Sequence, residues 1–290
     1  MLNKLMKHDF RALSRTLFPL QIGILGGGLV ATLLTALTIR LNDASWAGTN
    51  GSSLLKGLIM AVTGTASVLI GLAIIASTLV TLIFICYHFY RSFLTEEGYL
   101  TFTLPVSTSN LLWSKLFTGM FWTLINCIVV AVTLLIFAVF GTTTNTLVNQ
   151  SVLSAIRYFF TDLMPQATQY FNVPLVSVEV VVIGIIALAA QMLQIYFAII
   201  VGGQVAKKHK ILAAIGMYLL INMGVGIVSS TFMAAVTLGE GTMSLALNSV
   251  QEVGTFMTSV FGWYGVLFAG LCVLFFLVSR SILRKNLNLQ

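Results

Sequence analysis

Residues 91–115 read RSFLTEEGYLTFTLPVSTSNLLWSK and separate two long apolar segments of the chain. Arg91 closes the first apolar segment, and Glu96 and Glu97 form the only adjacent acidic pair in the sequence. Gly98 then breaks the helical pattern, and Pro105 ends a short amphiphilic stretch. We interpret residues 91–115 as a cytoplasmic loop between two membrane spans, and the other spans are counted outward from it.

The composition indicates a polytopic membrane protein. Of the 290 residues, 58% are apolar and 8% are charged, whereas soluble domains carry about 25% charged residues. Six apolar runs each exceed the ~20 residues that a helix needs to cross the hydrocarbon core. We therefore expect an all-α fold with six transmembrane helices, at about residues 17–39, 57–88, 116–141, 179–206, 211–238 and 253–280, in one transmembrane domain that covers residues 1–290.

Residues 1–16 predict an amphipathic interfacial helix before the first span. Apolar residues recur there at helical spacing, and a basic stripe follows another face: Lys4, Lys7, Arg11 and Arg15. This pattern is typical of a helix that lies in the inner headgroup layer of the membrane. We expect Pro19 to turn the chain into the membrane.

The distribution of basic residues predicts the orientation. With the amino terminus inside, twelve of the 15 Lys and Arg residues fall on the inner side and three on the outer side. We therefore expect a multi-pass protein of the cell (cytoplasmic) membrane with both termini in the cytoplasm. The net charge of +7 then reflects this topology and contact with anionic membrane lipid, and it gives no indication of nucleic acid binding.

Motifs for catalysis or nucleotide binding are missing from the sequence. There is no G-x-x-x-x-G-K-[ST] phosphate loop, no HExxH and no GxSxG. The three cysteines, Cys86, Cys127 and Cys272, lie in or beside apolar segments without metal-ligand spacing. We therefore expect a protein that is not an enzyme and that binds no metal or cofactor itself.

The middles of the predicted spans contain amides and hydroxyls but no Asp, Glu, Lys or Arg. Carriers coupled to protons or sodium usually need ionisable groups in the membrane, so this absence disfavours that class. Buried amides most often form hydrogen bonds between helices. A role in a translocation path is the alternative for four of them: Asn126, Gln191, Gln194 and Asn222.

One face of the second span carries small residues that let another helix approach closely. These residues, a candidate subunit seam, are Thr63, Gly64, Ser67 and Gly71.

The loop and the carboxyl terminus resemble those of a known family. The sequence EEGYLTFTLPVSTSNLLWSKL at 96–116 and the ending Arg284-Lys285-Asn286-Leu287 resemble bacterial ABC-2-type ABC transporter permeases. Many of these carry an acidic-glycine element, a T-L-P-[VT]-S stretch and a lysine that opens the third span. The six spans and the amphipathic amino terminus agree with this resemblance, which implies the ABC-2 (type V) exporter permease fold.

The resemblance also implies a mechanism. Two separate ABC ATPase subunits, which bind ATP and Mg²⁺, would dock on the inner face of a permease pair whose second copy is identical or homologous. A coupling helix would contact the ATPase through Thr95, Glu96, Glu97, Gly98, Tyr99, Leu100, Phe102, Thr103, Leu104 and Pro105. Glu96 and Glu97 would meet basic partners on the ATPase or on the amino-terminal helix. The expected function is export of an amphiphilic or hydrophobic substrate (peptide, lipid-like compound or drug) by alternating access.

Three alternatives stay open. The loop at 91–115 could be an ordinary connector. The protein could also be a non-transporting membrane anchor or sensor that binds a cytoplasmic partner, or an ion-coupled secondary carrier.

Overall fold

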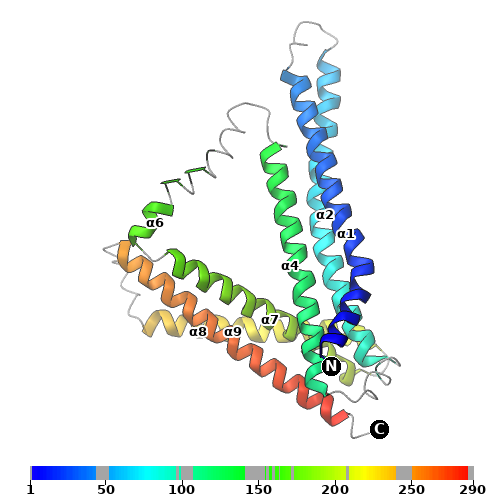
Figure 1. Ribbon diagram of the computed structural model, residues 1–290, viewed down its shortest axis with the longest axis vertical. Helices are drawn as coiled ribbons and strands as arrows, with labels where there is room; N and C mark the ends of the chain where they lie inside the picture. The colour runs from blue at the N-terminus through cyan, green and yellow to red at the C-terminus, as the bar shows by residue number, and fades with distance from the viewer. Residues whose placement is uncertain are drawn as a thin grey trace. The chain divides into compact units, whose positions relative to one another are not determined.

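The computed structural model describes residues 2–43, 52–95, 98, 107–140, 154, 157–158, 161–162, 164–170, 173–206, 209–239 and 250–286. These residues are almost entirely helical and include no strand (Figure 1). The helices are α1 (Leu2–Asp43), α2 (Ser52–Leu94), α4 (Thr108–Phe140), α6 (Met164–Tyr170), α7 (Val173–Val205), α8 (Lys210–Gly239) and α9 (Val250–Asn286). Six of them, all but α6, are long and apolar enough to cross a membrane. The predicted all-α, multi-pass class is confirmed.

The loop after the second span is shorter than predicted. Helix α2 continues through Leu94 and α4 begins at Thr108, so Lys115 lies inside α4 and does not open it. Ser107, a residue type favoured at the start of helices, accepts backbone hydrogen bonds from Asn110 and Leu111. This early start places Lys115 on a helix face that packs against other helices.

Helix α1 is continuous, and the turn predicted at Pro19 is wrong. The helix runs from Leu2 to Asp43 with Pro19 in its interior, so residues 2–16 are helical but do not form a helix of their own. An interior proline costs a helix about 3 kcal/mol. The apolar length on both sides of Pro19 outweighs this cost, since a membrane-spanning helix must keep its other backbone hydrogen bonds.

The chain forms two compact units. The first comprises residues 1–9, 86–120 and 164–290, and the second comprises residues 10–85 and 121–163. Helices α1, α2 and α4 therefore each contribute residues to both units, whereas α7, α8 and α9 belong to the first.

In the first unit, α7 packs against both α8 and α9. The backbones of α7 and α8 meet at Gly202, where an added Cβ atom would lie 2.4 Å from the Cα atom of Ala214. Small residues allow such close approach between helices. Within this unit the rings of Phe89 and Tyr196 stack on each other, with centroids 4.0 Å apart. Both side chains are buried.

The second unit contains the remaining lengths of α1, α2 and α4. Thr133 of α4 packs directly onto Gly28 of α1, where an added Cβ atom would lie 2.5 Å from the Thr133 methyl group. Near one end of this unit, Phe10 stacks on Trp122 with ring centroids 5.4 Å apart. These contacts join α1 to α4 at two levels in this unit.

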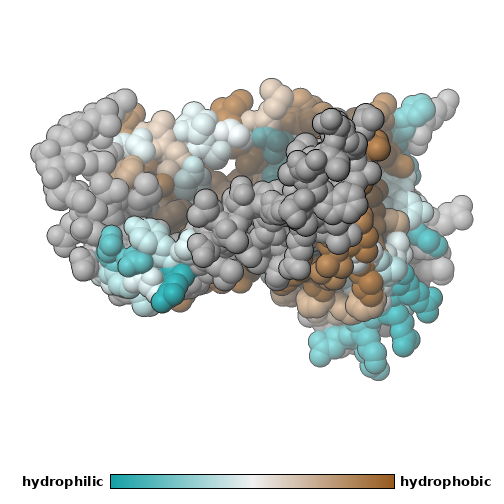
Figure 2. All heavy atoms as spheres, turned by 90° about the horizontal axis from the view of Figure 1, so that it is seen from above, coloured by the Kyte–Doolittle hydropathy of each residue, from teal (hydrophilic) through white to brown (hydrophobic). Residues whose placement is uncertain are grey.

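Apolar side chains lie on the outside of the molecule, as the brown surface in Figure 2 shows. Helix α8 is a clear case, because six of its large apolar residues in the first half are exposed: Ile211, Leu212, Ile215, Leu219, Leu220 and Met223. Soluble monomers rarely expose apolar patches of this extent. The exterior therefore suits a lipid environment.

Candidate functional site

The end of α2 is anchored beside the turn between α7 and α8. The Lys210 Nζ atom donates a hydrogen bond of 3.4 Å to the carbonyl oxygen of Leu94. At Gly203, an added Cβ atom would lie 2.7 Å from the Leu94 side chain, so α7 passes close to the same residue. A cation at the carboxyl end of a helix stabilises the carbonyl groups that have no partner there.

Only the beginning of the predicted coupling helix is described. The Thr95 hydroxyl donates to the carbonyl oxygen of Arg91 at 2.6 Å, and the Gly98 N–H donates to the carbonyl oxygen of Thr95 at 2.8 Å. An added Cβ atom at Gly98 would lie 2.9 Å from the Phe93 carbonyl oxygen, so glycine is required for this turn. The other predicted contact residues lie outside the described residues: Glu96, Glu97, Tyr99, Leu100, Phe102, Thr103, Leu104 and Pro105.

A buried ionic cluster lies next to these helix ends, in the first unit. The Asp9 carboxylate accepts hydrogen bonds from the Lys115 Nζ atom at 2.5 Å and from the Ser114 hydroxyl at 2.7 Å. The His88 Nε2 atom lies 3.2 Å from Asp9 and 3.1 Å from Lys115 Nζ. Asp9 and Lys115 are 4% and 7% exposed, so both charges are withdrawn from solvent. We call Asp9, His88, Ser114 and Lys115 the ionic cluster.

The ionic cluster extends to a fourth helix. The Tyr196 hydroxyl of α7 donates a 3.1 Å hydrogen bond to the carbonyl oxygen of Lys115. The Tyr196 ring also stacks on Phe89, the neighbour of His88. Polar and aromatic contacts therefore join the ends of α1, α2, α4 and α7 in this unit.

Sequence reasoning did not single out Asp9 and treated Lys115 as a loop residue. A signal was available, because Asp9 follows Leu5 and precedes Leu13 at four-residue intervals and so lies on the apolar face of the helix. It is also the only acidic residue in a segment whose other charges are basic. An acid on an apolar face indicates a buried partner.

The candidate path residue Asn126 belongs to a polar cluster in the second unit. The Gln21 Nε2 atom donates to Asn126 Oδ1 at 3.1 Å and to Thr81 Oγ1 at 3.3 Å. Asn126 Nδ2 in turn donates to Thr78 Oγ1 at 3.3 Å. The Gln21 Oε1 atom is buried without a hydrogen-bond partner among the described residues. We call Gln21, Thr78, Thr81 and Asn126 the amide cluster, and it connects α1, α2 and α4.

The other candidate path residues form pairs between α7 and α8. Gln191 Nε2 donates to the Tyr218 hydroxyl at 2.9 Å, and Gln194 Nε2 donates to Asn222 Oδ1 at 3.3 Å. These are hydrogen bonds between neighbouring helices, the ordinary use of amides in membrane proteins. The structure thus brings Gln194 and Asn222 together, whereas the partners of Asn126 belong to the second unit.

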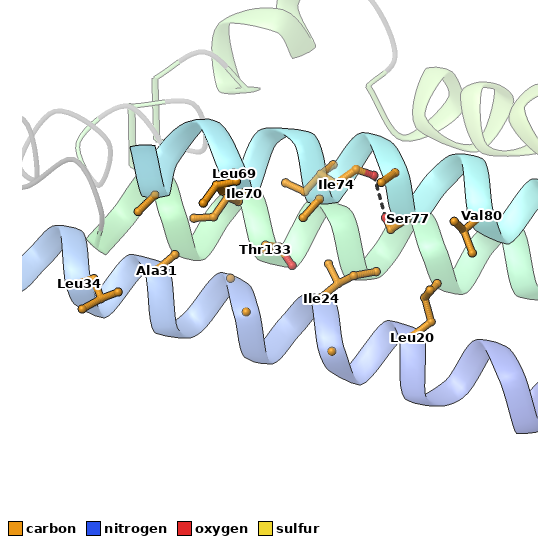
Figure 3. Close-up of a pocket in the computed structure, with 16 residues that line it drawn as sticks. Leu20, Ile24, Ala31, Leu34, Leu69, Ile70, Ile74, Ser77, Val80 and Thr133 are labelled. Atoms are coloured by element: carbon orange, nitrogen blue, oxygen red, sulfur yellow. Dashed lines mark hydrogen bonds between the residues drawn. The ribbon is translucent and has the colours of Figure 1, made fainter. Parts of the chain in front are cut away.

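A partly open apolar groove of about 660 Å³ lies in the second unit, among α1, α2 and α4 (Figure 3). Leu20 and Ile24 line it from α1, and Ile70 and Ile74 line it from α2. Its hydroxyls, on Ser77 and Thr133, donate to carbonyl oxygens of their own helices at 2.7 and 2.8 Å. The groove surface therefore offers an occupant mainly apolar contact.

The predicted seam on α2 is partly described. No atom of the described chain lies within 4 Å of a Cβ added at Gly64 or Gly71, so both glycines face open space. The side chains of Thr63 and Ser67 lie outside the described part of the chain.

Comparison of the chain with protein-family models, with curated proteins and with solved structures gives no match.

Proposed function

We propose that this chain is the transmembrane permease subunit of an ATP-driven exporter of the ABC-2 type. It would act with two ATPase subunits that carry ATP and Mg²⁺ and with a second permease copy, identical or homologous. The observation that supports this best is the anchoring of both flanks of segment 95–107. Leu94 contacts Lys210 and Gly203, and Ser114 and Lys115 bond Asp9.

This anchoring suits a segment that receives force from a partner. A flexible connector does not need anchored ends. A coupling element does, because its displacement must be transmitted to the membrane spans. Force on segment 95–107 would reach α1 and α7 through the ionic cluster and Tyr196, and would reach α8 through Lys210. In this proposal the loop and both termini face the cytoplasm, and the protein lies in the cytoplasmic membrane.

The interior polar groups support an amphiphilic or hydrophobic substrate, such as a peptide, a lipid-like compound or a drug. The groove offers mainly apolar contact, and the amide cluster holds a buried acceptor, Gln21 Oε1, without a partner among the described residues. An amphiphile carries an apolar part and a few hydrogen-bonding groups, which match these two features.

Affinity purification of the tagged protein from its native membrane tests the proposal. We expect a protein with a phosphate loop to co-purify and to hydrolyse ATP. Membrane vesicles that contain both proteins should accumulate a fluorescent amphiphile when ATP is supplied, and a Walker-lysine variant of the partner provides the control. A preparation free of any ATPase would contradict the proposal.

A second candidate, an ion-coupled secondary carrier, is favoured by the ionic cluster. Ionisable side chains buried in apolar helices often form ion or proton pathways, and Asp9, His88 and Lys115 are such a group. Uptake driven by a proton gradient in vesicles without ATP, and lost in Asp9→Asn, would select this candidate over the exporter.

A further inference from the structure

We propose that the ionic cluster is a clamp that makes the ends of α1, α2 and α4 move as one body. The inference rests on the proposed function, because it assigns Asp9, His88 and Lys115 as positioning residues for coupling. They hold the spans in the arrangement through which displacement of segment 95–107 is transmitted.

The clamp joins the three helices that run through both units. Helix α1 leaves the first unit after Asp9, α2 enters it at Cys86 and α4 leaves it after Met120. The ionic cluster contributes Asp9, His88 and Lys115 from these same helices, each within a few residues of the boundary. The cluster therefore fixes the spacing of the three helices where they leave the first unit.

The polar groups of the ionic cluster bond one another. An ion-binding site would instead leave ligand atoms free for the ion. Asp9 accepts from Ser114 and Lys115 and lies within hydrogen-bond distance of His88, so its two oxygens are both occupied. One carboxylate balances one ammonium group, and the His88 Nε2 atom lies beside both, where it can donate to Asp9 or accept from Lys115. A buried pair with this geometry fixes one arrangement of its helices, since removal of one partner leaves the other charge buried alone.

The clamp also has a rigid support in its own unit. Leu111, Leu112 and Leu116 flank Ser114 and Lys115 in the sequence of α4, and all three are at most 2% exposed. Tyr196 holds the carbonyl oxygen of Lys115 from α7. In this proposal, relative motion of α1 and α4 at this level requires the bonds from Ser114 and Lys115 to Asp9 to break.

Amide hydrogen exchange of the full-length protein in detergent micelles, followed by mass spectrometry, tests the clamp. We expect Asp9→Asn and Lys115→Met to speed exchange at least tenfold in peptides that cover residues 2–9 and 108–115. The charge-reversed double variant, Asp9→Lys with Lys115→Asp, should restore exchange to within threefold of the original protein. The matched control is Lys7→Asn, which removes an exposed charge from the same segment and should leave exchange unchanged.

Two outcomes would overturn the clamp. One is unchanged exchange in both single variants. The other is a neutral double variant, Asp9→Asn with Lys115→Met, that restores the original exchange rate while the charge-reversed double variant does not. This result would show that the single variants act only by leaving one charge buried without its partner.

A second measurement separates the clamp from the proposed function. In preparations where an ATPase co-purifies, each single variant should lower ATP turnover at least threefold without changing the amount of bound ATPase, and the reversed pair should recover it. If no ATPase co-purifies, the exporter proposal fails, while the exchange result still decides the clamp.

Discussion

Individual residues in this protein are constrained most where backbones or charges meet. Gly202 is one such residue, because α8 occupies the space that its side chain would need. We expect Gly202→Ala to destabilise the protein by about 1–3 kcal/mol, the usual effect of overpacking. Unfolding in mixed micelles with increasing denaturing detergent measures this change.

The matched control is Gly216→Ala on α8. No atom of the described residues lies within 4 Å of a Cβ added there, so the substitution adds helix propensity without a clash among them. We expect it to be neutral or stabilising by up to about 1 kcal/mol. Equal destabilisation by both variants would contradict the close contact at Gly202.

Tyr196 provides a second test at this scale. Tyr196→Phe keeps the ring that stacks on Phe89 and removes the hydroxyl that donates to Lys115. We expect a loss of about 1 kcal/mol, the net value of one neutral hydrogen bond. Tyr196→Ala should cost about 3–5 kcal/mol, since it also empties the core of the unit. Similar losses in the two variants, measured by the same unfolding assay, would argue against the stacked arrangement.

At the scale of single helices, Pro19 gives the most direct prediction. It lies within α1, where it removes one backbone hydrogen bond. We expect Pro19→Ala to stabilise the protein by about 1–3 kcal/mol, because the helix already runs through this position. Thermal unfolding in detergent checks the sign, and a lower unfolding midpoint would contradict this prediction.

A second prediction at the scale of single elements concerns segment 95–107. Under the proposed function, Leu100→Glu with Leu104→Glu should abolish stimulation of the partner ATPase by this protein. The variant should keep the unfolding midpoint of the original protein, because the helices on either side retain their own anchors at Leu94 and Lys115. Unchanged stimulation would favour an ordinary connector.

The helices followed from the sequence, but the contacts between them did not. Charge-free apolar runs are long enough to identify six spans, because hydrocarbon excludes charge. The positions of Asp9 and Lys115 were missed, because hydropathy treats a charge near the end of a span as solvated. Of the candidate path residues, the pairing of Gln194 with Asn222 needed the structure, since a short connection indicates that two helices are neighbours but not which of their faces meet.

For the whole molecule, the predicted orientation awaits a direct test. We expect a fluorescent protein that folds only in the cytoplasm to be active when it is fused after Gln290. An enzyme that matures only outside the cytoplasm should be active when inserted in the segment 44–50. The reverse pattern would overturn the orientation predicted from the basic residues.

The exposed apolar surface of the molecule can be tested by chemical labelling of a cysteine. Cys127 is free and exposed on a helix long enough to span the membrane. We expect neutral and charged maleimides both to leave it unmodified in intact membranes, because the thiolate that attacks a maleimide does not form in hydrocarbon, and both to label it after unfolding in denaturing detergent. Cys127→Ser provides the control, and labelling by the charged reagent in intact membranes would place this face in water.

The contact of α7 with α8 also bears on how the chain is made. Four residues separate Val205 from Lys210, and the two backbones touch at Gly202. During synthesis the second helix of this hairpin therefore emerges beside the first, and both can partition into the bilayer together. Insertion of the two helices as a pair would let Gln194 and Asn222 bond each other, as they do in the folded protein, and would lower the cost of moving each amide into hydrocarbon.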